Sequence, residues 1–273
     1  MPIADEGDHH LTSLFSPISL EQLNRKAAML ERLDNKYVVR MPVLLEAARE
    51  LARHFEILEI DGVRSFTYDT CYFDDEQLHC YHDHHQGRRK RCKIRVRRYL
   101  DAGLCYVEIK LKHKRGITLK KRLKTTPDRY GVLDHAARAY IEQAYEALYG
   151  MPYPHRLRPV IEMRYRRITL VAREGGERMT IDGGMAFRHD GASRQTDGDV
   201  FIVEAKSANG NGLADRILRG FHQHPITGCS KYCVGMAALD LVPRHNRFLP
   251  ALRRLNALPA RERTIGADHV RHE

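Results

Sequence analysis

The sequence predicts an α+β protein built on a closed antiparallel β-barrel of about eight strands, which forms a cationic tunnel with helices packed on its outside. Two observations support this fold class. Three consecutive segments between residues 92 and 125 alternate basic with aliphatic residues. The stretch 88–124 holds 16 Lys and Arg residues against 2 acidic ones, a net charge of +14 in a chain whose total is +11. The excess positive charge therefore belongs to one region.

The first part of the chain predicts a tail, two helices and a strand. Residues 1–16 are expected to form a polar N-terminal tail. Ser19 and Gln22 have the spacing of a capping box, which predicts a helix over 19–30. A short strand is predicted over 34–41, and Pro42 suits the first turn of a helix through 41–55.

The middle of the chain predicts strands and one long helix. Residues 66–75 and 78–84 are expected to be two strands joined at the acidic pair Asp74-Asp75. The three strands with alternating cations follow. The clearest helical period runs over 131–150, where Gly150 is expected to end the helix.

The last part of the chain adds further strands and helices to the predicted fold. Strands are predicted over 159–172, 177–182, 185–190 and 200–207, and helices over 212–221 and 227–239. We expect residues 17–241 to form a single domain and residues 242–273 to form a partly ordered C-terminal tail.

The alternating cations suggest what the barrel encloses. Side chains along a strand point alternately to opposite faces, so these segments put cations on one face and aliphatic groups on the other. A sheet with one solvated face also explains this pattern. However, like charges in facing strands repel unless something neutralises them. Acids of the same parity, such as Glu108 with Lys110 and Glu204 with Lys206, favour a charged interior that binds a highly charged anion.

Composition also bears on location and partners. No segment approaches the roughly 20 apolar residues that span a bilayer, and the N-terminus lacks the pattern of a secretory signal. The six cysteines form no C-x-x-C pair, which favours reduced thiols and a cytoplasmic location. Trp is absent and the basic strands lack interleaved aromatic residues for base stacking, so no nucleic-acid partner is expected.

A histidine cluster raises a zinc hypothesis. It consists of His79, His82, His84 and His85 together with Cys80. Its spacing matches no familiar zinc site and it falls in a predicted strand and turn, so we expect no metal there.

Several short motifs occur in a characteristic order between about Glu31 and Met236. They are “ERLDNKYVV”, “KIRVRRY”, “VEIKLK”, “LKKRLK”, “MRYRRIT”, “ERMTID”, “VEAKS” and “CSKY”. Each is weak alone, but their order and spacing resemble the VTC (vacuolar transporter chaperone) domain family. That family is the polyphosphate polymerase branch of the CYTH-like triphosphate tunnel metalloenzymes.

The resemblance implies phosphate-binding and catalytic roles for particular residues. By motif, the residues matched to phosphate binding are Lys36, Arg95, Arg97, Lys110, Lys120, Arg122, Tyr165, Arg167, Arg178, Lys206, Ser230 and Lys231. Those matched to catalysis are Arg95, Arg97, Lys110, Arg167 and Glu204. Glu204 matches the metal-binding glutamate, with Glu108, Glu162 and Asp182 as weaker metal candidates. The expected cofactor is Mn²⁺ or Mg²⁺, which prefer carboxylate and phosphate oxygens.

The resemblance implies transfer of the ATP γ-phosphate onto inorganic polyphosphate or orthophosphate, with release of ADP. Two alternatives stay open: hydrolysis of tripolyphosphate or a nucleoside triphosphate on the same barrel, and non-catalytic binding of polyphosphate or nucleic acid. The hydrolase relatives usually begin with an E-x-E-x-K strand, which “ERLDNKYVV” lacks. Fungal relatives work within a membrane complex, so a membrane partner on another chain is possible. The oligomeric state is left open.

Overall fold

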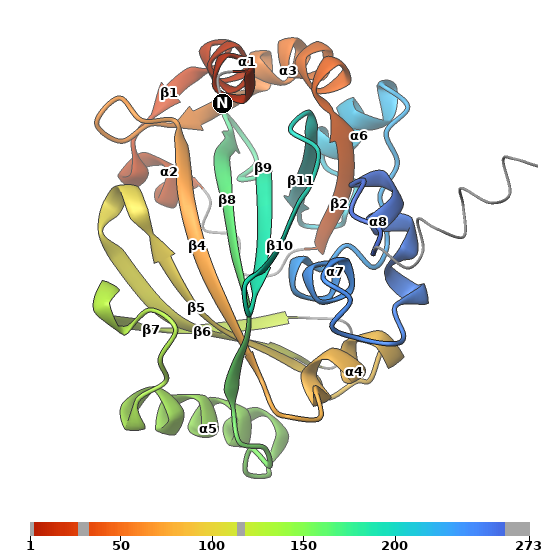
Figure 1. The fold of residues 1–273 in the computed structure, drawn as a ribbon. Coiled ribbons are helices and arrows are strands. Elements are labelled where there is room, and N and C mark those ends of the chain that lie inside the picture. Colours follow the sequence, from red (N-terminus) through yellow and green to blue (C-terminus); the bar gives the residue numbers. More distant parts are fainter. Residues whose placement is uncertain (1–2, 27–32, 114–117, 260–273) are drawn as a thin grey trace, which may run out of the picture. The chain divides into compact units, whose positions relative to one another are not determined.

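The structure is a computed structural model that describes residues 3–26, 33–113 and 118–259 (Figure 1). These residues form an α+β fold with a large, mainly antiparallel sheet, as predicted. They divide into two compact units. Unit 1 comprises described residues within 1–67, 165–185 and 196–227, and unit 2 those within 68–164, 186–195 and 228–273. The predicted bounds of a single domain at 17–241 stay a prediction.

Each unit has its own elements, and three strands contribute residues to both. Unit 1 holds α1 (Ile3–Ser13), β1 (Ser16–Ile18), α2 (Leu20–Lys26), β2 (Leu33–Arg40), α3 (Met41–His54), β3 (Phe55–Leu58), β11 (Val200–Ser207) and α6 (Leu213–Gly220). Unit 2 holds α4 (His79–Gln86), β5 (Cys92–Tyr99), β6 (Leu104–Lys112), β7 (Thr118–Thr125), α5 (His135–Tyr149), β10 (Ala192–Gln195), α7 (Lys231–Ala238) and α8 (Leu249–Arg254). The shared strands are β4 (Ser65–Asp74), β8 (Arg158–Ala172) and β9 (Arg178–His189).

The core of unit 1 lies between one face of its sheet and the helices α1, α3 and α6. Strands β2 and β11 are antiparallel, and β11 is also antiparallel to β9. Alternate residues of these strands, such as Tyr37, Val203 and Ile181, are buried in one apolar cluster with Leu44 and Leu218. The intervening residues therefore point to the opposite face, where the charged side chains of these strands lie.

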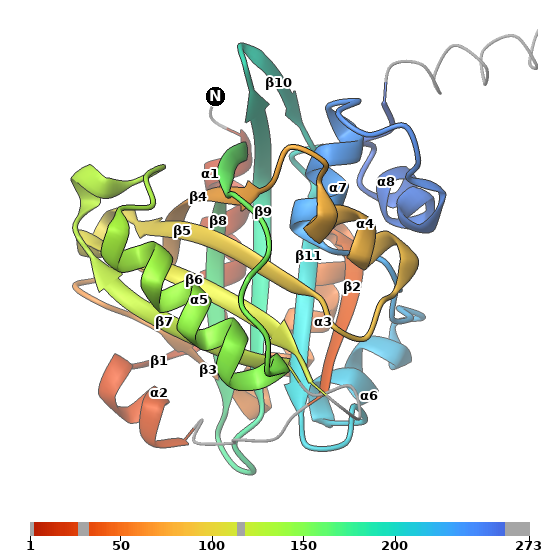
Figure 2. The ribbon, with the colours of Figure 1, turned by 90° about the horizontal axis from the view of Figure 1, so that it is seen from below.

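The sheet of unit 2 is covered on its aliphatic side by helix α5. Strands β4, β5, β6 and β7 are consecutive antiparallel neighbours. Figure 2 shows α5 lying across β6 and β7. Asp134 caps α5 by accepting a hydrogen bond from the Ala137 N–H at 2.8 Å, and Gly150 ends it with a φ of 69°, as predicted. We infer that the apolar stripe of α5 and the aliphatic face of the strands bury one another.

The expectation of a closed barrel is wrong. The strand order is β2-β11-β9-β8-β4-β5-β6-β7, and within the described residues its two end strands are not paired with each other. The edge of β2 is already occupied in unit 1, where the Ile226 N–H donates to the Lys36 carbonyl at 2.7 Å. At the other end, β7 carries Lys and Arg residues that are exposed or half-buried, and charge on an edge strand opposes further pairing.

The strand predicted over 78–84 is also wrong, because this segment forms helix α4. Asp74 accepts hydrogen bonds from the N–H groups of Cys80 and Tyr81, each at 2.9 Å. Asp75 accepts from Gln77 at 2.9 Å and from His79 at 3.3 Å. These carboxylates satisfy N–H groups that a helix start leaves without partners. Gly87, with a φ of 72°, ends the helix.

The chain ends differ in part from the prediction. Residues 3–13, expected within a polar tail, form helix α1, whose Leu11 is buried in the core of unit 1. Ser19 and Gln22 form the predicted capping box of α2, while residues 27–30 of that predicted helix lie outside the described residues. Residues 249–254 of the predicted C-terminal tail form α8, and 260–273 lie outside the described part. No helix among the described residues is long and apolar enough to cross a membrane.

Candidate functional site

The three basic strands of unit 2 align their charged residues in rows across one face. Lys93, Lys110 and Lys120 are successive cross-strand partners, as are Arg95, Glu108 and Arg122. The next row joins Arg97, Tyr106 and Lys124. We call this surface the β5–β7 face, and it consists of these nine residues. Alternation alone predicts that the cations and Glu108 share this face, and the register confirms it.

The centre of the β5–β7 face is Glu108, whose residue has no solvent exposure. Its Oε2 accepts from Arg95 Nε at 2.7 Å and lies 2.5 Å from Arg95 Nη2. Arg97 Nη1 lies 3.9 Å from the same oxygen, and Lys120 forms an ion pair with Oε1. Three cations therefore meet a single carboxylate, which leaves this cluster with a formal net charge of +2.

The electrostatics of this cluster shift the pKa values of its members. Burial acts to raise the pKa of Glu108, but the charges of Arg95, Arg97 and Lys120 outweigh it and hold the pKa well below its ordinary value. Partial burial lowers the pKa of Lys120 to about 8, assisted by the charges of Arg95 and Arg97 and opposed by Glu108. Lys120 remains the most exposed of the four, with 36% of its side chain accessible. The Lys120 side chain is therefore partly open to solvent.

Strand β4 supports the two arginines from the side. Arg95 Nη1 donates to the Tyr72 hydroxyl, and Arg97 Nε donates to Thr70 Oγ1, each at 3.2 Å. Burial acts to raise the pKa of Tyr72, but the charges of Arg95 and Arg97 lower it overall. The Tyr72 ring also stacks on Tyr232 of α7, with centroids 5.1 Å apart. Both guanidinium groups are thus held in fixed positions.

Other predicted residues of unit 2 lie on or beside the β5–β7 face. The Arg122 guanidinium lies over the Tyr106 ring, 4.9 Å from its centroid. Lys93 Nζ donates to Ser230 Oγ at 3.5 Å, so the start of α7 lies next to this face. Lys231, the first residue of α7, is buried. The structure therefore brings Ser230 together with the cations of β5.

Unit 1 holds a second charged cluster, around Glu204 of β11. Glu204 is the cross-strand partner of Lys36 and Thr180, and Lys206 is that of Asp34 and Arg178. Glu204 Oε1 accepts from Lys206 Nζ at 2.6 Å, and its Oε2 lies 4.0 Å from Lys36 Nζ. Burial lowers the pKa of Lys206, although the Glu204 carboxylate opposes this. The predicted metal ligand is therefore a nearly buried carboxylate between two ammonium groups.

Arg167 and Asp182 form a bidentate ion pair in the same unit. Arg167 donates through Nε to Asp182 Oδ1 at 2.6 Å and through Nη2 to Oδ2 at 2.7 Å. Asp182 is fully buried. The Arg167 guanidinium also lies 5.5 Å from the centroid of the Tyr165 ring. Both carboxylate oxygens of Asp182 are thus engaged by one guanidinium.

The residues on either side of Lys36 anchor it from the opposite face of β2. The Tyr37 hydroxyl donates to Asp215 Oδ1 at 2.5 Å, and Asn35 Nδ2 donates to the same oxygen at 2.9 Å. Asp215 belongs to α6 and is fully buried. Because neighbours along a strand alternate in direction, this anchor fixes Lys36 toward the charged face.

Glu162 is the predicted candidate that the structure separates from these clusters. It is exposed on β8 and has the opposite parity to Tyr165 on that strand. It shares its side of the strand with Arg164, whose guanidinium pairs with Asp69 at 2.7 and 2.9 Å. Glu162 therefore faces away from the side on which Tyr165 lies.

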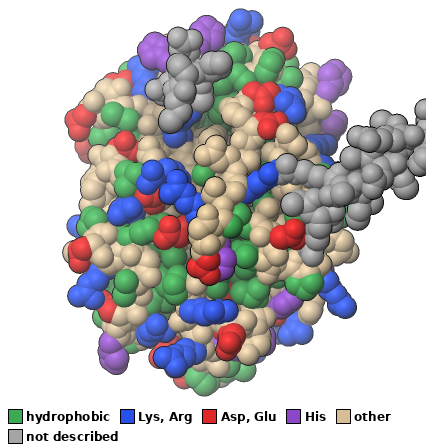
Figure 3. All heavy atoms as spheres, in the orientation of Figure 1, with side chains coloured by type: hydrophobic (Ala, Val, Ile, Leu, Met, Phe, Trp, Pro, Cys, Tyr) green, Lys and Arg blue, Asp and Glu red, His purple; other side chains and the backbone are tan. Residues whose placement is uncertain are grey.

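Sequence reasoning missed the supporting residues Thr70, Tyr72 and Asp215. The alternation of β4 places Thr70 and Tyr72 on one face, but only the pairing register shows that they lie across from Arg97 and Arg95. Asp215 is far from Tyr37 in sequence, and nothing near it signals the contact. On the face seen in Figure 3, Lys and Arg side chains are interspersed with acidic ones. The basic character is therefore not one continuous patch there.

Comparison with known proteins assigns the family. The family model of the VTC domain matches residues 31–240. The chain therefore belongs to the VTC domain family, which confirms the resemblance seen in the sequence. A search of curated proteins gives no match.

Several solved structures resemble the fold in part. One is a candidate adenylate cyclase from Bacillus halodurans, at 12% identity and a TM-score of 0.48, covering 74% of this chain and 95% of that one. A candidate adenylate cyclase from Vibrio parahaemolyticus has 12% identity and a TM-score of 0.44, covering 75% and 97%. A candidate adenylyl cyclase from Hippeastrum with a dominant triphosphatase activity has 13% identity and a TM-score of 0.44, covering 78% and 98%. The family assignment stands on the VTC match alone.

Proposed function

We propose that this protein is a metal-dependent phosphoryl-transfer enzyme that moves the γ-phosphate of ATP onto a growing polyphosphate chain and releases ADP. The observation that carries the proposal is the cluster around Glu108, where Arg95, Arg97 and Lys120 leave an excess of positive charge beside a fully buried carboxylate. An inorganic polyanion is the ligand that such an excess favours. Membership of the VTC family supports the same reaction class.

The β5–β7 face supplies the main phosphate contacts in this proposal. Arg95, Arg97 and Arg122 offer planar donor pairs that match phosphate oxygens. Lys110 and Lys120 add compact ammonium charges that adjust to a moving chain. Tyr72 and Thr70 hold the arginines in place, so less ordering is needed when the anion binds.

The remaining phosphate-binding roles follow the family motifs. They are proposed for Lys36, Tyr165, Arg167, Arg178, Lys206, Ser230 and Lys231. Arg167 is catalytic in this proposal together with Arg95, Arg97, Lys110 and Glu204. Of these residues, Lys206 Nζ lies 2.6 Å and Lys36 Nζ 4.0 Å from an oxygen of the Glu204 carboxylate.

Glu204 is the proposed protein ligand for Mn²⁺ or Mg²⁺. The donor chemistry fits, because these ions bind through one or two carboxylates together with substrate phosphates and water. Of the other carboxylates proposed, Glu108 and Asp182 are paired with cations, as Glu204 itself is, and Glu162 is exposed. The choice of Glu204 therefore follows the family motif. When bound, the ion neutralises charge on the phosphate oxygens.

The chemical step needs positioning more than acid–base catalysis. A terminal oxygen of polyphosphate or orthophosphate attacks the γ-phosphorus, the bond from that phosphorus to the β–γ bridging oxygen breaks, and ADP departs with that oxygen. The nucleophile is already anionic, so no side chain has to remove a proton from it. The cations stabilise charge on the transferred group and the leaving phosphate. Water in place of the chain end would give hydrolysis, which is the alternative function.

Incubation of the purified chain with ATP and Mn²⁺ tests this proposal. We expect polyphosphate on a gel and ADP in solution, with both lost in Arg95→Ala. Lys121→Ala is the matched control, because Lys121 is on β7 but points away from the β5–β7 face. Release of orthophosphate without polyphosphate would assign the hydrolase reaction instead. The absence of any turnover of ATP or tripolyphosphate would contradict both enzymatic functions.

A further inference from the structure

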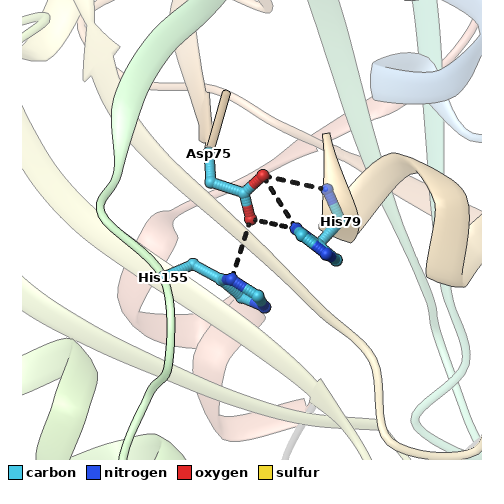
Figure 4. Close-up of side chains that lie close together, drawn as sticks. All are labelled: Asp75, His79 and His155. Atoms are coloured by element: carbon cyan, nitrogen blue, oxygen red, sulfur yellow. Dashed lines mark hydrogen bonds and ion pairs between the residues drawn. The ribbon is translucent and has the colours of Figure 1, made fainter. Parts of the chain in front are cut away.

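Unit 2 contains a cluster of metal-ligating side chains outside the two charged clusters. Asp75 follows β4, His79 begins α4, and His155 lies in the segment that precedes β8. One donor atom from each residue lies within 4.8 Å of the others. Figure 4 shows both imidazole rings turned toward the Asp75 carboxylate. Three chain segments thus converge on one point.

The distances suit a small cation with nitrogen and oxygen ligands. Asp75 Oδ2 lies 2.8 Å from His79 Nδ1 and 3.3 Å from His155 Nδ1. Ligands about 2.1 Å from a tetrahedral zinc ion lie about 3.4 Å from one another. Small side-chain movements are therefore enough to place an ion among these three atoms.

The carboxylate of Asp75 is built into the fold. Its side chain is 4% exposed, and its Oδ1 accepts hydrogen bonds from the Gln77 and His79 N–H groups. Its Oδ2 is the oxygen that both histidines approach. The side chains of His79 and His155 are 43% and 28% exposed, so an ion here has access to water. The anchored ligand and the open side are typical of a site with three protein ligands and a water molecule.

We propose that Asp75, His79 and His155 bind a divalent transition-metal ion, with Zn²⁺ the best match. Two imidazoles and one carboxylate favour zinc and related ions over Mg²⁺, which prefers oxygen ligands alone. An imidazole binds zinc through the lone pair of one ring nitrogen, so a ring that binds through Nδ1 carries its proton on Nε2. The rings stack with centroids 4.0 Å apart and planes 15° from parallel, so they turn about their Cβ–Cγ bonds when the ion binds.

This site is chemically distinct from the Mn²⁺ or Mg²⁺ ligand proposed at Glu204. A bound ion ties the segment that precedes β8 to the start of α4, and so acts as a clip within unit 2. The sequence predicts no metal at the cluster of His79, His82, His84, His85 and Cys80, and of these residues only His79 belongs to the site proposed here. His84 is held by the Cys80 carbonyl, 2.8 Å from its Nδ1, and His85 Nε2 lies 2.7 Å from Asn246 Oδ1.

Zinc binding to the full chain, purified without a polyhistidine tag, tests the site. Titration calorimetry and metal analysis after dialysis are expected to give one equivalent of bound Zn²⁺ that excess Mg²⁺ does not displace. His79→Gln and His155→Gln are each expected to weaken zinc binding at least about tenfold. Even mutation of residues that only hydrogen-bond to a metal ligand typically lowers metal affinity by about that factor. His135→Gln, an exposed histidine on α5, is the matched control and keeps wild-type affinity.

Two outcomes would overturn the site. One is a wild-type chain that binds no zinc, and the other is equal zinc binding in wild type and both variants. If a variant fails to fold by circular dichroism, Co²⁺ spectroscopy of the wild-type chain decides. Strong visible absorption from a four-coordinate ion with nitrogen and oxygen ligands supports the site, and a spectrum of hydrated Co²⁺ alone contradicts it.

Discussion

Glu108 lies directly across from Arg95 in the β5–β6 pair, and its carboxylate accepts a hydrogen bond from Arg95 Nε at 2.7 Å. The pair is buried, and two further cations share the same carboxylate. Glu108 thus neutralises part of a charge that would otherwise destabilise the fold. The cluster keeps a formal net charge of +2.

Removing the charge of Glu108 should destabilise the protein. Glu108→Gln keeps the shape of the side chain but leaves three cations without their carboxylate, which should lower the free energy of unfolding by roughly 3 kcal/mol. Urea denaturation measures this change. Glu142→Gln, on the exposed side of α5, is the control and should change little. Tripolyphosphate should raise the stability of Glu108→Gln, and a midpoint equal to wild type would contradict the assignment.

Phosphate affinity should fall as pH rises through the pKa of Lys120, which is about 8. Below this pH the side chain is charged and attracts phosphate, and above it the attraction is lost. Metal-free binding of tripolyphosphate between about pH 7 and pH 9 measures the effect. Lys120→Arg should keep its affinity across this range, because arginine stays charged. Identical pH profiles for wild type and Lys120→Arg would contradict the prediction.

Loss of the proton from Lys120 should also change the stability of the fold. Stability should rise with pH, whereas phosphate affinity falls. The folded-state pKa lies below the ordinary lysine value of 10.5, so between the two values the unfolded chain binds the extra proton. Stability without ligand should therefore rise with pH from about 8 to about 10 relative to Lys120→Arg. Urea midpoints of the two proteins across this range measure the difference, and parallel curves would contradict it.

The hydroxyl of Tyr37 should be needed for stability. It donates to the buried Asp215 carboxylate, so Tyr37→Phe leaves that carboxylate short of a donor and should cost about 1–3 kcal/mol. Chemical denaturation measures the loss. Tyr140→Phe on α5 is a suitable comparison, since Tyr140 is only half-buried. A cost equal to that of Tyr140→Phe would show that the contact contributes nothing.

Glu204 should be required for Mn²⁺-dependent turnover. Replacing it with Gln removes the proposed ligand charge, and kcat should fall by at least roughly 100-fold. Electron paramagnetic resonance of free Mn²⁺ in the presence of ATP should show weaker binding as well. Glu174→Gln, an exposed residue, serves as the control. Normal Mn²⁺ binding in Glu204→Gln would place the metal elsewhere.

Much of the charged architecture could be predicted from local pattern. Alternation placed Lys93, Arg95 and Arg97 on one face, because side chains along a regular strand alternate with a period of two. Pro42 and Gly150 marked a helix start and a helix end for similar local reasons. These features depend on few neighbours.

Other features depend on contacts that no local pattern contains. Helix α4 exists because Asp74 and Asp75 bind its first N–H groups, and a histidine-rich segment alone does not predict that. Closure into a barrel was inferred from charge, whereas sheet closure depends on how edges pair. The edge of β2 is taken by Ile226, a residue remote in sequence. The meeting of His155 with Asp75 was unforeseen for the same reason.

The most direct test of the central claim compares two adjacent lysines of β7. Lys120 belongs to the β5–β7 face and pairs with Glu108, whereas Lys121 points to the other side of the strand. Calorimetric titration with tripolyphosphate should show a loss of affinity of roughly tenfold or more for Lys120→Ala, because a hydrogen bond to a charged group contributes about 1.5–3 kcal/mol. Lys121→Ala should bind like wild type. Equal affinities for the two variants, or no binding by the wild-type chain, would contradict a phosphate-binding role for this face.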